Sequence, residues 1–160
     1  MDHIFQRVVG SKRISLLDGF SGYNQVLVLP SDQRKTAFTT PWGTIMYVKI
    51  PFGLMNVGAT FQRAMDIAFS KDIGYFIVIY LDDITVYSKT NEEHLVHLRK
   101  VFEKCRKYGL SLNPKKTLFN LQEGKILGHI ISEEGINIDP KIIEGILQIN
   151  HPRNIKEMQS

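Results

Sequence analysis

The stretch YFIVIYLDDITVYS, residues 75–88, decides the fold. Its first half, residues 75–81, is apolar and rich in β-branched and aromatic side chains, which predicts a buried strand. Residues 84–88 alternate in polarity and predict a second strand with only one face covered. Because only Asp82 and Asp83 separate the two strands, this pair lies at or next to a tight hairpin bend.

Further strands and helices are predicted on both sides of this hairpin. Strands are expected at residues 13–18, 36–40, 44–50, 117–121 and 125–131. Apolar residues at helical spacing predict helices over residues 58–70, from Thr90 to a stop at Gly109, and from Pro140 to about Ile149. The apolar stripe of the second helix consists of Leu95, Leu98, Val101, Phe102 and Cys105. Since most connections are too short for parallel crossovers, we predict an α+β domain, an antiparallel sheet with helices on one face.

Composition and charge limit the class of protein. The chain has 160 residues, of which 43% are hydrophobic and 22% charged, as in a single globular domain. Its longest apolar run is too short to cross a bilayer, and Cys105 alone cannot form an internal disulfide, so an intracellular protein without a membrane partner is expected. The net charge is +4, and basic residues concentrate between His97 and Lys125. That block is either a phosphate-binding flank or a solvated helix face.

The carboxylates at the hairpin bend carry the chemical argument. Adjacent acids near a sheet core repel each other and are costly to bury, and a hard divalent cation such as Mg²⁺ removes that cost. The alternative is an Asp-Asp turn with both side chains in water. Asp18 ends the strand at residues 13–18, and if the two strands are neighbours, Asp18 reaches Asp82 and Asp83. Three carboxylates would then hold two metal ions about 3.5–4 Å apart, as in-line phosphoryl transfer requires.

Several segments resemble those of one polymerase family. Residues 80–83 (YLDD) resemble the YxDD box of reverse transcriptases, and residues 17–23 (LDGFSGY) resemble the aspartate motif that precedes it. The segments PFGLMN (51–56), ATFQR (59–63), KTAF (35–38) and TPWG (40–43) resemble those of Gypsy-type LTR retrotransposon polymerases. NPKK (113–116) and LGH (127–129) match the lysine motif and the primer-contacting turn of this family. The motifs occur in the family's order, from about residue 14 to the end.

The resemblance implies an RNA-directed DNA polymerase that adds deoxynucleotides to a primer. Its fold would be a reverse-transcriptase palm with a ferredoxin-like core and part of the fingers. Asp18, Asp82 and Asp83 would be the catalytic residues and would ligate two Mg²⁺ ions, with Mn²⁺ as a possible substitute. The implied partners are an RNA or DNA template with its primer, deoxynucleoside triphosphates and the other domains of a Pol polyprotein.

The resemblance also assigns binding roles. The incoming nucleotide would contact Gly19, Tyr23, Phe52 and Gly53; the template and primer would contact Gln62, Tyr80, Lys115, Lys116, Gly128 and His129. The ring of Tyr23 would exclude a ribose 2′-hydroxyl. Lys115 or Lys116 would protonate the departing pyrophosphate, unless the two form a plain surface pair. His129 on an apolar strand is alternatively a structural histidine.

The chain departs from the family pattern in places. Many retroviral relatives have glutamine at the position of Phe52, and the family often has proline where Gly58 stands. Only residues 1–12 precede the first strand, where the family has its fingers, and no segment resembles a thumb or ribonuclease H. We therefore expect residues 1–160 to be one palm-centred, truncated domain of a larger polyprotein, located in cytoplasmic virus-like particles or in the nucleus.

Two other interpretations remain open at this stage. The chain is alternatively an inactive remnant that keeps the fold and binds metal and nucleic acid weakly, because a triphosphate held without its clamp loses orientation. It is alternatively a binding-only module whose sheet presents Phe76, Tyr80 and Tyr87 to single-stranded RNA. The binding-only interpretation leaves the three aspartates unexplained, since acids beside a stacking surface repel phosphate.

Overall fold

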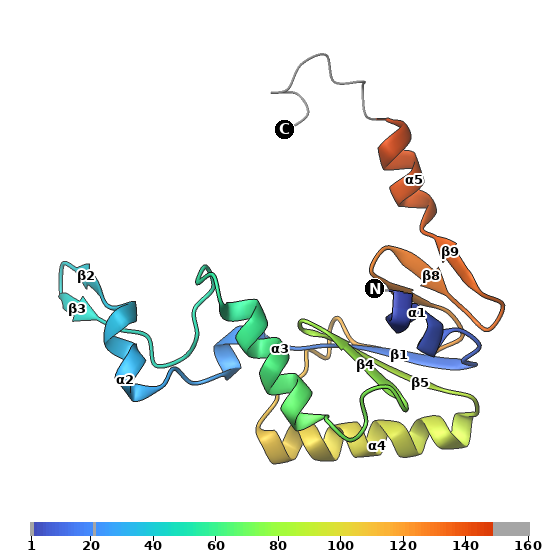
Figure 1. Ribbon diagram of the computed structural model, residues 1–160, viewed down its shortest axis with the longest axis horizontal. Helices are drawn as coiled ribbons and strands as arrows, with labels where there is room; N and C mark the ends of the chain where they lie inside the picture. Colours follow the sequence, from blue (N-terminus) through green and yellow to red (C-terminus); the bar gives the residue numbers. More distant parts are fainter. Residues whose placement is uncertain (1, 21, 149–160) are drawn as a thin grey trace.

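A four-stranded antiparallel sheet organises the computed structural model, which describes residues 2–20 and 22–148 (Figure 1). Its strands are β1 (Arg13–Asp18), β4 (Ile77–Tyr80), β5 (Asp83–Ser88) and β6 (Leu118–Leu121), in the spatial order β4-β5-β1-β6. Helices α3 (Val57–Ala68) and α4 (Asn91–Tyr108) supply the two long connections. The chain order β1-α3-β4-β5-α4-β6 is the β-α-β-β-α-β pattern of ferredoxin-like folds. The predicted α+β class and antiparallel sheet are confirmed.

The two long helices pack on one face of this sheet. Apolar residues of β1, β4 and β5 that point to this face meet the buried stripes of the helices, and together they form the larger core cluster: Leu17, Phe61, Met65, Ala68, Phe69, Phe76, Ile77, Ile79, Ile84, Val86, Leu98, Val101 and Cys105. Burying such side chains contributes about 1.5–3 kcal/mol each. The helical apolar spacing over residues 58–70 therefore corresponds to the buried face of α3, where Phe61, Met65 and Ala68 pack toward the sheet.

The opposite face of the sheet is covered as well. It packs against α1 (Asp2–Val8) and a second sheet of β7 (Gly124–Ile126), β8 (His129–Ile131) and β9 (Ile136–Ile138). The expectation that β5 has only one covered face is wrong, because Thr85 and Tyr87 are buried beneath this second layer. The alternating polarity of β5 thus reflects two buried faces: an apolar one toward α3 and α4, and a mixed polar and apolar one toward the second sheet.

Helix α4 begins and ends as its sequence predicts. The hydroxyl of Thr90 accepts a hydrogen bond from the Glu93 amide at 3.2 Å, and Gly109 ends the helix with a φ of 67°. The predicted stripe is wrong at Leu95 and Phe102, which are 70% and 39% exposed. His94 is buried instead, because Ser15 and Ser88 satisfy its ring nitrogens at 2.7 and 3.0 Å. A polar residue with two partners can thus take a core position that periodicity assigns to leucine.

The predicted strand over residues 125–131 is in fact two strands. Leu127 and Gly128 have φ values of 48° and 79°, and this left-handed turn separates β7 from β8. The two strands pair with each other, with Ile126 opposite His129. An extended segment cannot contain two successive left-handed residues, so the chain reverses here.

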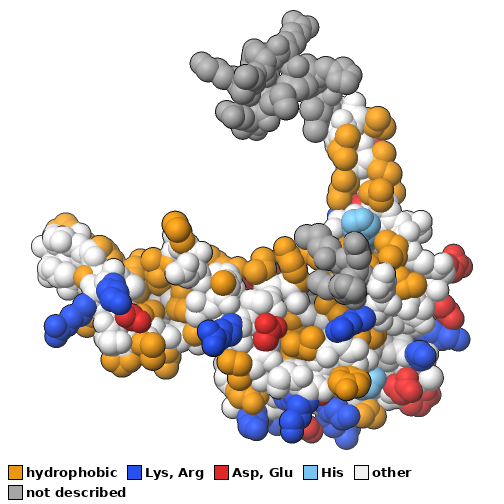
Figure 2. All heavy atoms as spheres, in the orientation of Figure 1, with side chains coloured by type: hydrophobic (Ala, Val, Ile, Leu, Met, Phe, Trp, Pro, Cys, Tyr) orange, Lys and Arg blue, Asp and Glu red, His pale blue; other side chains and the backbone are white. Residues whose placement is uncertain are grey.

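An arm projects from the sheet between β1 and α3 (Figure 1). It consists of η1 (Gly22–Gln25), α2 (Pro30–Gln33), η2 (Arg34–Thr36), β2 (Phe38–Thr40) and β3 (Gly43–Ile45), the last two forming a hairpin. The two predicted extended segments are confirmed only over these shorter strands. Many apolar side chains of the arm are exposed (Figure 2), among them Leu27, Leu29, Trp42, Val48 and Met55.

Helix α5 (Pro140–Leu147) also projects from the domain, and the predicted end of this helix at Ile149 lies outside the described residues. Asp139 caps its start, accepting from the Lys141 amide at 3.1 Å. The apolar side chains Ile143, Ile146 and Leu147 are exposed along it. Among the described residues, no helix combines the length and the apolar character needed to span a bilayer.

Two glycines allow a test of this backbone. Gly128→Ala places a side chain at a φ of 79° and is expected to destabilise the protein by about 1–2 kcal/mol. Gly58→Ala lies within α3, where an added Cβ meets Leu81 only at ordinary contact distance (3.6 Å), and is expected to stabilise by roughly 0.5–1 kcal/mol. Urea unfolding followed by circular dichroism measures both. Equal effects of the two substitutions would contradict the assigned turn.

Candidate active site

The register of β1 and β5 places two of the three predicted acids opposite each other. Asp18 pairs with Asp83 at the end of the antiparallel ladder, and Tyr80 pairs with Asp83 on the other side. Directly opposed residues point to the same face of a sheet, so all three side chains lie on the face that β7 and β8 cover. The Gly19 amide donates to the Asp82 carbonyl at 3.0 Å and extends the contact by one residue. The predicted convergence of Asp18 with the hairpin is therefore present.

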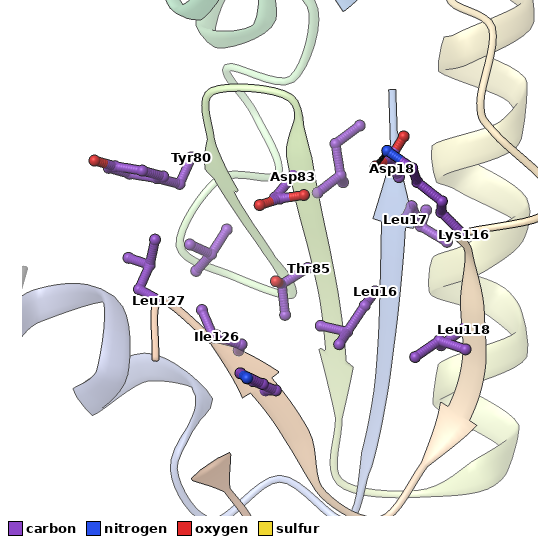
Figure 3. Close-up of a pocket in the computed structure, with 13 residues that line it drawn as sticks. Leu16, Leu17, Asp18, Tyr80, Asp83, Thr85, Lys116, Leu118, Ile126 and Leu127 are labelled. Carbon is purple, nitrogen blue, oxygen red and sulfur yellow. Dashed lines mark ion pairs between the residues drawn. The ribbon is translucent and has the colours of Figure 1, made fainter. Parts of the chain in front are cut away.

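Asp18 and Asp83 open into a pocket between the two sheets, here called the carboxylate pocket (Figure 3). It is lined by Leu16, Leu17, Asp18, Val78, Tyr80, Asp83, Ile84, Thr85, Lys116, Leu118, Lys125, Ile126 and Leu127. The acids and Lys116 lie at one end of the pocket, and apolar side chains form most of the rest. A charged group at the edge of such a wall is incompletely hydrated, which strengthens every interaction between charges there.

The environment of Asp83 disfavours its ionised form. Its pKa is raised above the ordinary value, first because burial removes hydration and then because Asp82 and Asp18 carry the same charge. Lys116 acts in the opposite direction and lowers the pKa of Asp83. The Lys116 ammonium lies 3.5 Å from the Asp18 carboxylate and is the cation that partly compensates the acids.

Asp82 lies on the other side of the hairpin. Its Cβ is only 3.3 Å from where a Cβ at Gly22 would lie, and it does not line the carboxylate pocket. The pKa of Tyr23 is raised, mainly by burial and further by the charge of Asp82. Asp82 therefore faces the η1 side of the site, where Gly22 lets the chain approach closely. The sequence analysis did not predict that Gly22 allows this close approach to Asp82, although a glycine at this position of LDGFSGY was the available signal. Ser21 of the same motif lies outside the described residues.

Three aromatic side chains form a cluster beside Asp82. The Tyr23 ring meets Phe52 edge-on at 5.2 Å between centroids and Phe61 at 5.5 Å. Phe61 is buried in the core, whereas Phe52 is 62% exposed. Gly53 follows with a φ of 98°, a conformation that favours glycine. The predicted nucleotide-contacting residues Gly19, Tyr23, Phe52 and Gly53 are thus brought to one side of the site.

Carboxylate oxygens are suitable ligands for a hard cation, but the three acids do not converge on one point in this structure. Among the described residues, no group of three or more His, Cys, Asp or Glu side chains is arranged to hold a metal ion. Asp18 and Asp83 nevertheless offer oxygen ligands on one face, and the pKa of Asp83 is raised by burial and then by repulsion from Asp82 and Asp18, which a cation would offset. Asp82 would have to turn toward them, and its position in the two-residue loop makes that a local change.

The predicted template and primer residues are divided between several places. Tyr80 lines the carboxylate pocket, and of the two exposed lysines it is Lys116 that approaches the acids. Gln62 uses its amide within the protein, accepting from the Leu81 amide at 2.8 Å.

The primer-turn residues occupy the β7–β8 connection. Gly128 forms the turn, next to Leu127 of the pocket. His129 packs against Phe5 at 4.7 Å between ring centroids, and its Nδ1 lies 3.1 Å from the Leu127 carbonyl. This packing favours a structural histidine over a ligand.

The basic block is mostly a helix face. Lysines and arginines line α4 along the lower edge of the molecule in Figure 2. Lys104 pairs with Asp72, and Lys100 and Lys107 lie over the rings of Phe76 and Tyr108. Because α4 covers the sheet face opposite the carboxylate pocket, this geometry favours the solvated helix face over the phosphate-binding flank.

Comparison with known proteins places these features in a wider context. The family model described as reverse transcriptase (RNA-dependent DNA polymerase) matches residues 2–131. The chain is 36% identical over 149 residues to the Pol polyprotein of transposon opus and 29% identical over 150 residues to that of transposon gypsy, both from Drosophila melanogaster. These matches span 93% and 94% of this chain but only 15% and 14% of those polyproteins.

The chain is also similar to solved structures of a reverse transcriptase. The foamy viral protease-reverse transcriptase in complex with RNA/DNA hybrid matches at a TM-score of 0.83, with 29% identity over 98% of this chain and 21% of that one. Its complex with double-stranded DNA matches at 0.87, again with 29% identity over 98% of this chain, and 27% of the other.

The raised pKa of Asp83 makes a prediction about stability. In EDTA at pH 7, Asp83→Asn should raise the melting temperature, because it removes a charge that folding disfavours. The gain should vanish as the pH falls below the pKa of Asp83, where the native carboxyl is protonated. Thermal unfolding at pH 7 and about pH 3 measures this, with about 2–4 °C expected for each kcal/mol in a chain of this size.

Asp139→Asn is the matched control with the opposite sign. The pKa of Asp139 is lowered by Lys125, by the Lys141 amide and by both lysine charges, so its contribution to stability is present above the ordinary carboxyl pKa and lost at lower pH. Asp139→Asn should therefore destabilise at pH 7. Two variants that shift the melting temperature in the same direction would refute the electrostatic account.

Proposed function

Because this chain belongs to the reverse transcriptase (RNA-dependent DNA polymerase) family, we propose that it supplies the palm of an RNA-directed DNA polymerase in a retrotransposon Pol polyprotein. The single observation that carries the proposal is the pairing of Asp18 with Asp83 next to Asp82. Acids from strands far apart in the sequence meet there at the edge of a pocket, although their repulsion costs stability. Such a cost is typical of active sites.

The proposed reaction is the addition of a deoxynucleotide to a primer 3′-hydroxyl with release of pyrophosphate. The family uses divalent metal, and we assign Asp18, Asp82 and Asp83 as its ligands, with two Mg²⁺ ions as the preferred occupants. Bound there, the metal would lower the pKa of the attacking hydroxyl and stabilise the leaving oxygens. The three carboxylates would supply its oxygen ligands, and its positive charge would offset the repulsion that Asp82 and Asp18 exert on Asp83.

The remaining residues orient the nucleotide and its leaving group. Tyr23, which packs edge-on against Phe61 and Phe52, would lie under the sugar. Gly19 and Gly53 would leave space for the triphosphate. Lys116 is preferred over Lys115 as the cation near the pyrophosphate because it already lies 3.5 Å from Asp18. The related foamy viral enzyme forms complexes with RNA/DNA hybrid and with double-stranded DNA, and we propose the same class of template and primer for this chain.

Both competing interpretations are weaker. A binding-only sheet needs free aromatic faces, but Phe76 and Tyr87 are 6% and 7% exposed. An inactive remnant has no need to keep like charges together, whereas this chain keeps Asp18 and Asp82 close enough to Asp83 to raise its pKa.

Primer extension with deoxynucleotides tests the catalytic assignment. Asp82→Asn and Asp83→Asn should each reduce the rate by about a thousandfold or more, because several kcal/mol of charge stabilisation depend on them. Glu134→Gln, in the exposed β8–β9 connection, is the control and should leave the rate unchanged. Calorimetric titration with Mn²⁺ gives a second readout that both site variants should weaken. Extension that survives both substitutions unaltered would show that the site is assigned wrongly.

Sugar selection tests the role of Tyr23. Tyr23→Ala should increase the incorporation of ribonucleotides relative to deoxynucleotides by roughly 10–100-fold, since one steric contact contributes about 1–3 kcal/mol of discrimination. The ratio of kcat/KM for the two nucleotides measures this. Tyr23→Phe keeps the ring and should keep the ratio; an unchanged ratio in Tyr23→Ala would place the sugar elsewhere.

A further inference from the structure

The tip of the β4–β5 hairpin holds a leucine in an unfavourable conformation. Tyr80 pairs with Asp83, so Leu81 and Asp82 form a two-residue loop. Leu81 has a φ of 55°, in the left-handed region where the first residue of such loops is usually Asn, Asp or Gly. An L-residue with a branched side chain is disfavoured there, and a neighbouring contact must hold it.

A side chain from α3 supplies that contact. Gln62 Oε1 accepts a hydrogen bond from the Leu81 amide at 2.8 Å. The other end of the same amide is fixed as well, because Gln62 Nε2 donates to Asp66 Oδ1 at 2.9 Å, one helical turn further along. Asp66 therefore determines which way the Gln62 amide points, and the carbonyl oxygen is held toward the hairpin.

Helix α3 is a rigid support for this pair. Phe61 and Met65 are each only 2% exposed and anchor the helix in the larger core cluster. The Leu81 side chain lies beside the first turn of this helix, with its Cδ2 3.6 Å from where a Cβ at residue 58 would lie. The hairpin tip is thus held to the helix at both its backbone and its side chain.

We propose that Gln62 and Asp66 are a positioning pair that holds Leu81 in its left-handed conformation and so sets the direction of the Asp82 carboxylate. Asp82 follows Leu81 directly, and a rotation about the Leu81 backbone would turn it relative to Asp18 and Asp83, which the strand register fixes. Gln62 acts through the loop and not on the template, to which the motif resemblance assigned it. The catalytic consequence rests on the proposed function, whereas the Gln62–Leu81 contact does not.

Amide hydrogen exchange of Leu81, followed by NMR on the full chain, tests the contact without requiring activity. Gln62→Leu removes the acceptor at similar volume, and the Leu81 amide should exchange about tenfold faster, as expected for one lost hydrogen bond. The double substitution Q62E/D66N should restore protection. The carboxylate that it creates at position 62 accepts from Leu81, the amide that it creates at position 66 donates to that carboxylate, and the charge of the pair is unchanged. Equal exchange in the parent and Gln62→Leu would overturn the inference.

Steady-state primer extension separates positioning from template binding. Gln62→Leu should lower kcat about tenfold with KM for the template–primer within about twofold of the parent, and Q62E/D66N should recover most of the loss. Adding Leu81→Asn should also reduce the loss, because asparagine adopts the left-handed conformation readily. A raised KM with unchanged kcat would identify a template contact and refute positioning. If the parent chain neither binds Mn²⁺ nor extends a primer, the proposed function fails, while the exchange measurement still decides the contact.

Discussion

The antiparallel pairing of β1 with β5 is the interaction on which the rest of this molecule depends. It places Asp18 opposite Asp83, and because side chains alternate along a strand, the same register sends Leu17 and Ile84 into the core beneath α3 and α4. A slip by one residue would turn those apolar side chains away from α3 and α4 and turn the acids into the core beneath the two helices. The hydrophobic core therefore fixes the positions of the acids, because the β1–β5 register that buries Leu17 and Ile84 is also the one that places Asp18 opposite Asp83.

The site is costly for the fold that contains it. Asp83 is partly desolvated and lies near the like charges of Asp82 and Asp18, Lys116 compensates only in part, and Leu81 takes a left-handed conformation next to α3. The repulsion at Asp83 and the conformation of Leu81 are each unfavourable. Both lie at the end of the sheet that carries the YLDD and LDGFSGY motifs. Strain and repulsion of this kind persist only where the surrounding packing over-determines them. Here Phe61, Met65 and the Gln62–Asp66 pair provide that packing.

Most of the fold was predictable from sequence because it follows from periodicity and capping. Residues 13–18 were visible as a short apolar run and the hairpin at residues 77–88 as β-branched and aromatic runs, and Thr90 and Gly109 marked both ends of α4. The errors have a common physical cause, which is tertiary context: His94 is buried in place of Leu95 because two serines satisfy it. The convergence of the acids was predictable only on the assumption that β1 and β5 are neighbours. The opposite directions of Asp82 and Asp83, and the internal use of Gln62, depend on loop geometry that no pattern encodes.

The central place of β1 in the sheet has a consequence for how the chain folds. The β4–β5 hairpin is local and can form within microseconds, whereas β1 joins it only after the whole segment from Gly19 to Asp82 has closed into a loop. Non-local pairings of this kind form slowly. Repulsion between Asp18 and the hairpin acids therefore arises late in folding, when the core under Leu17 is already closing, and a newly made chain spends most of its search without an assembled catalytic centre.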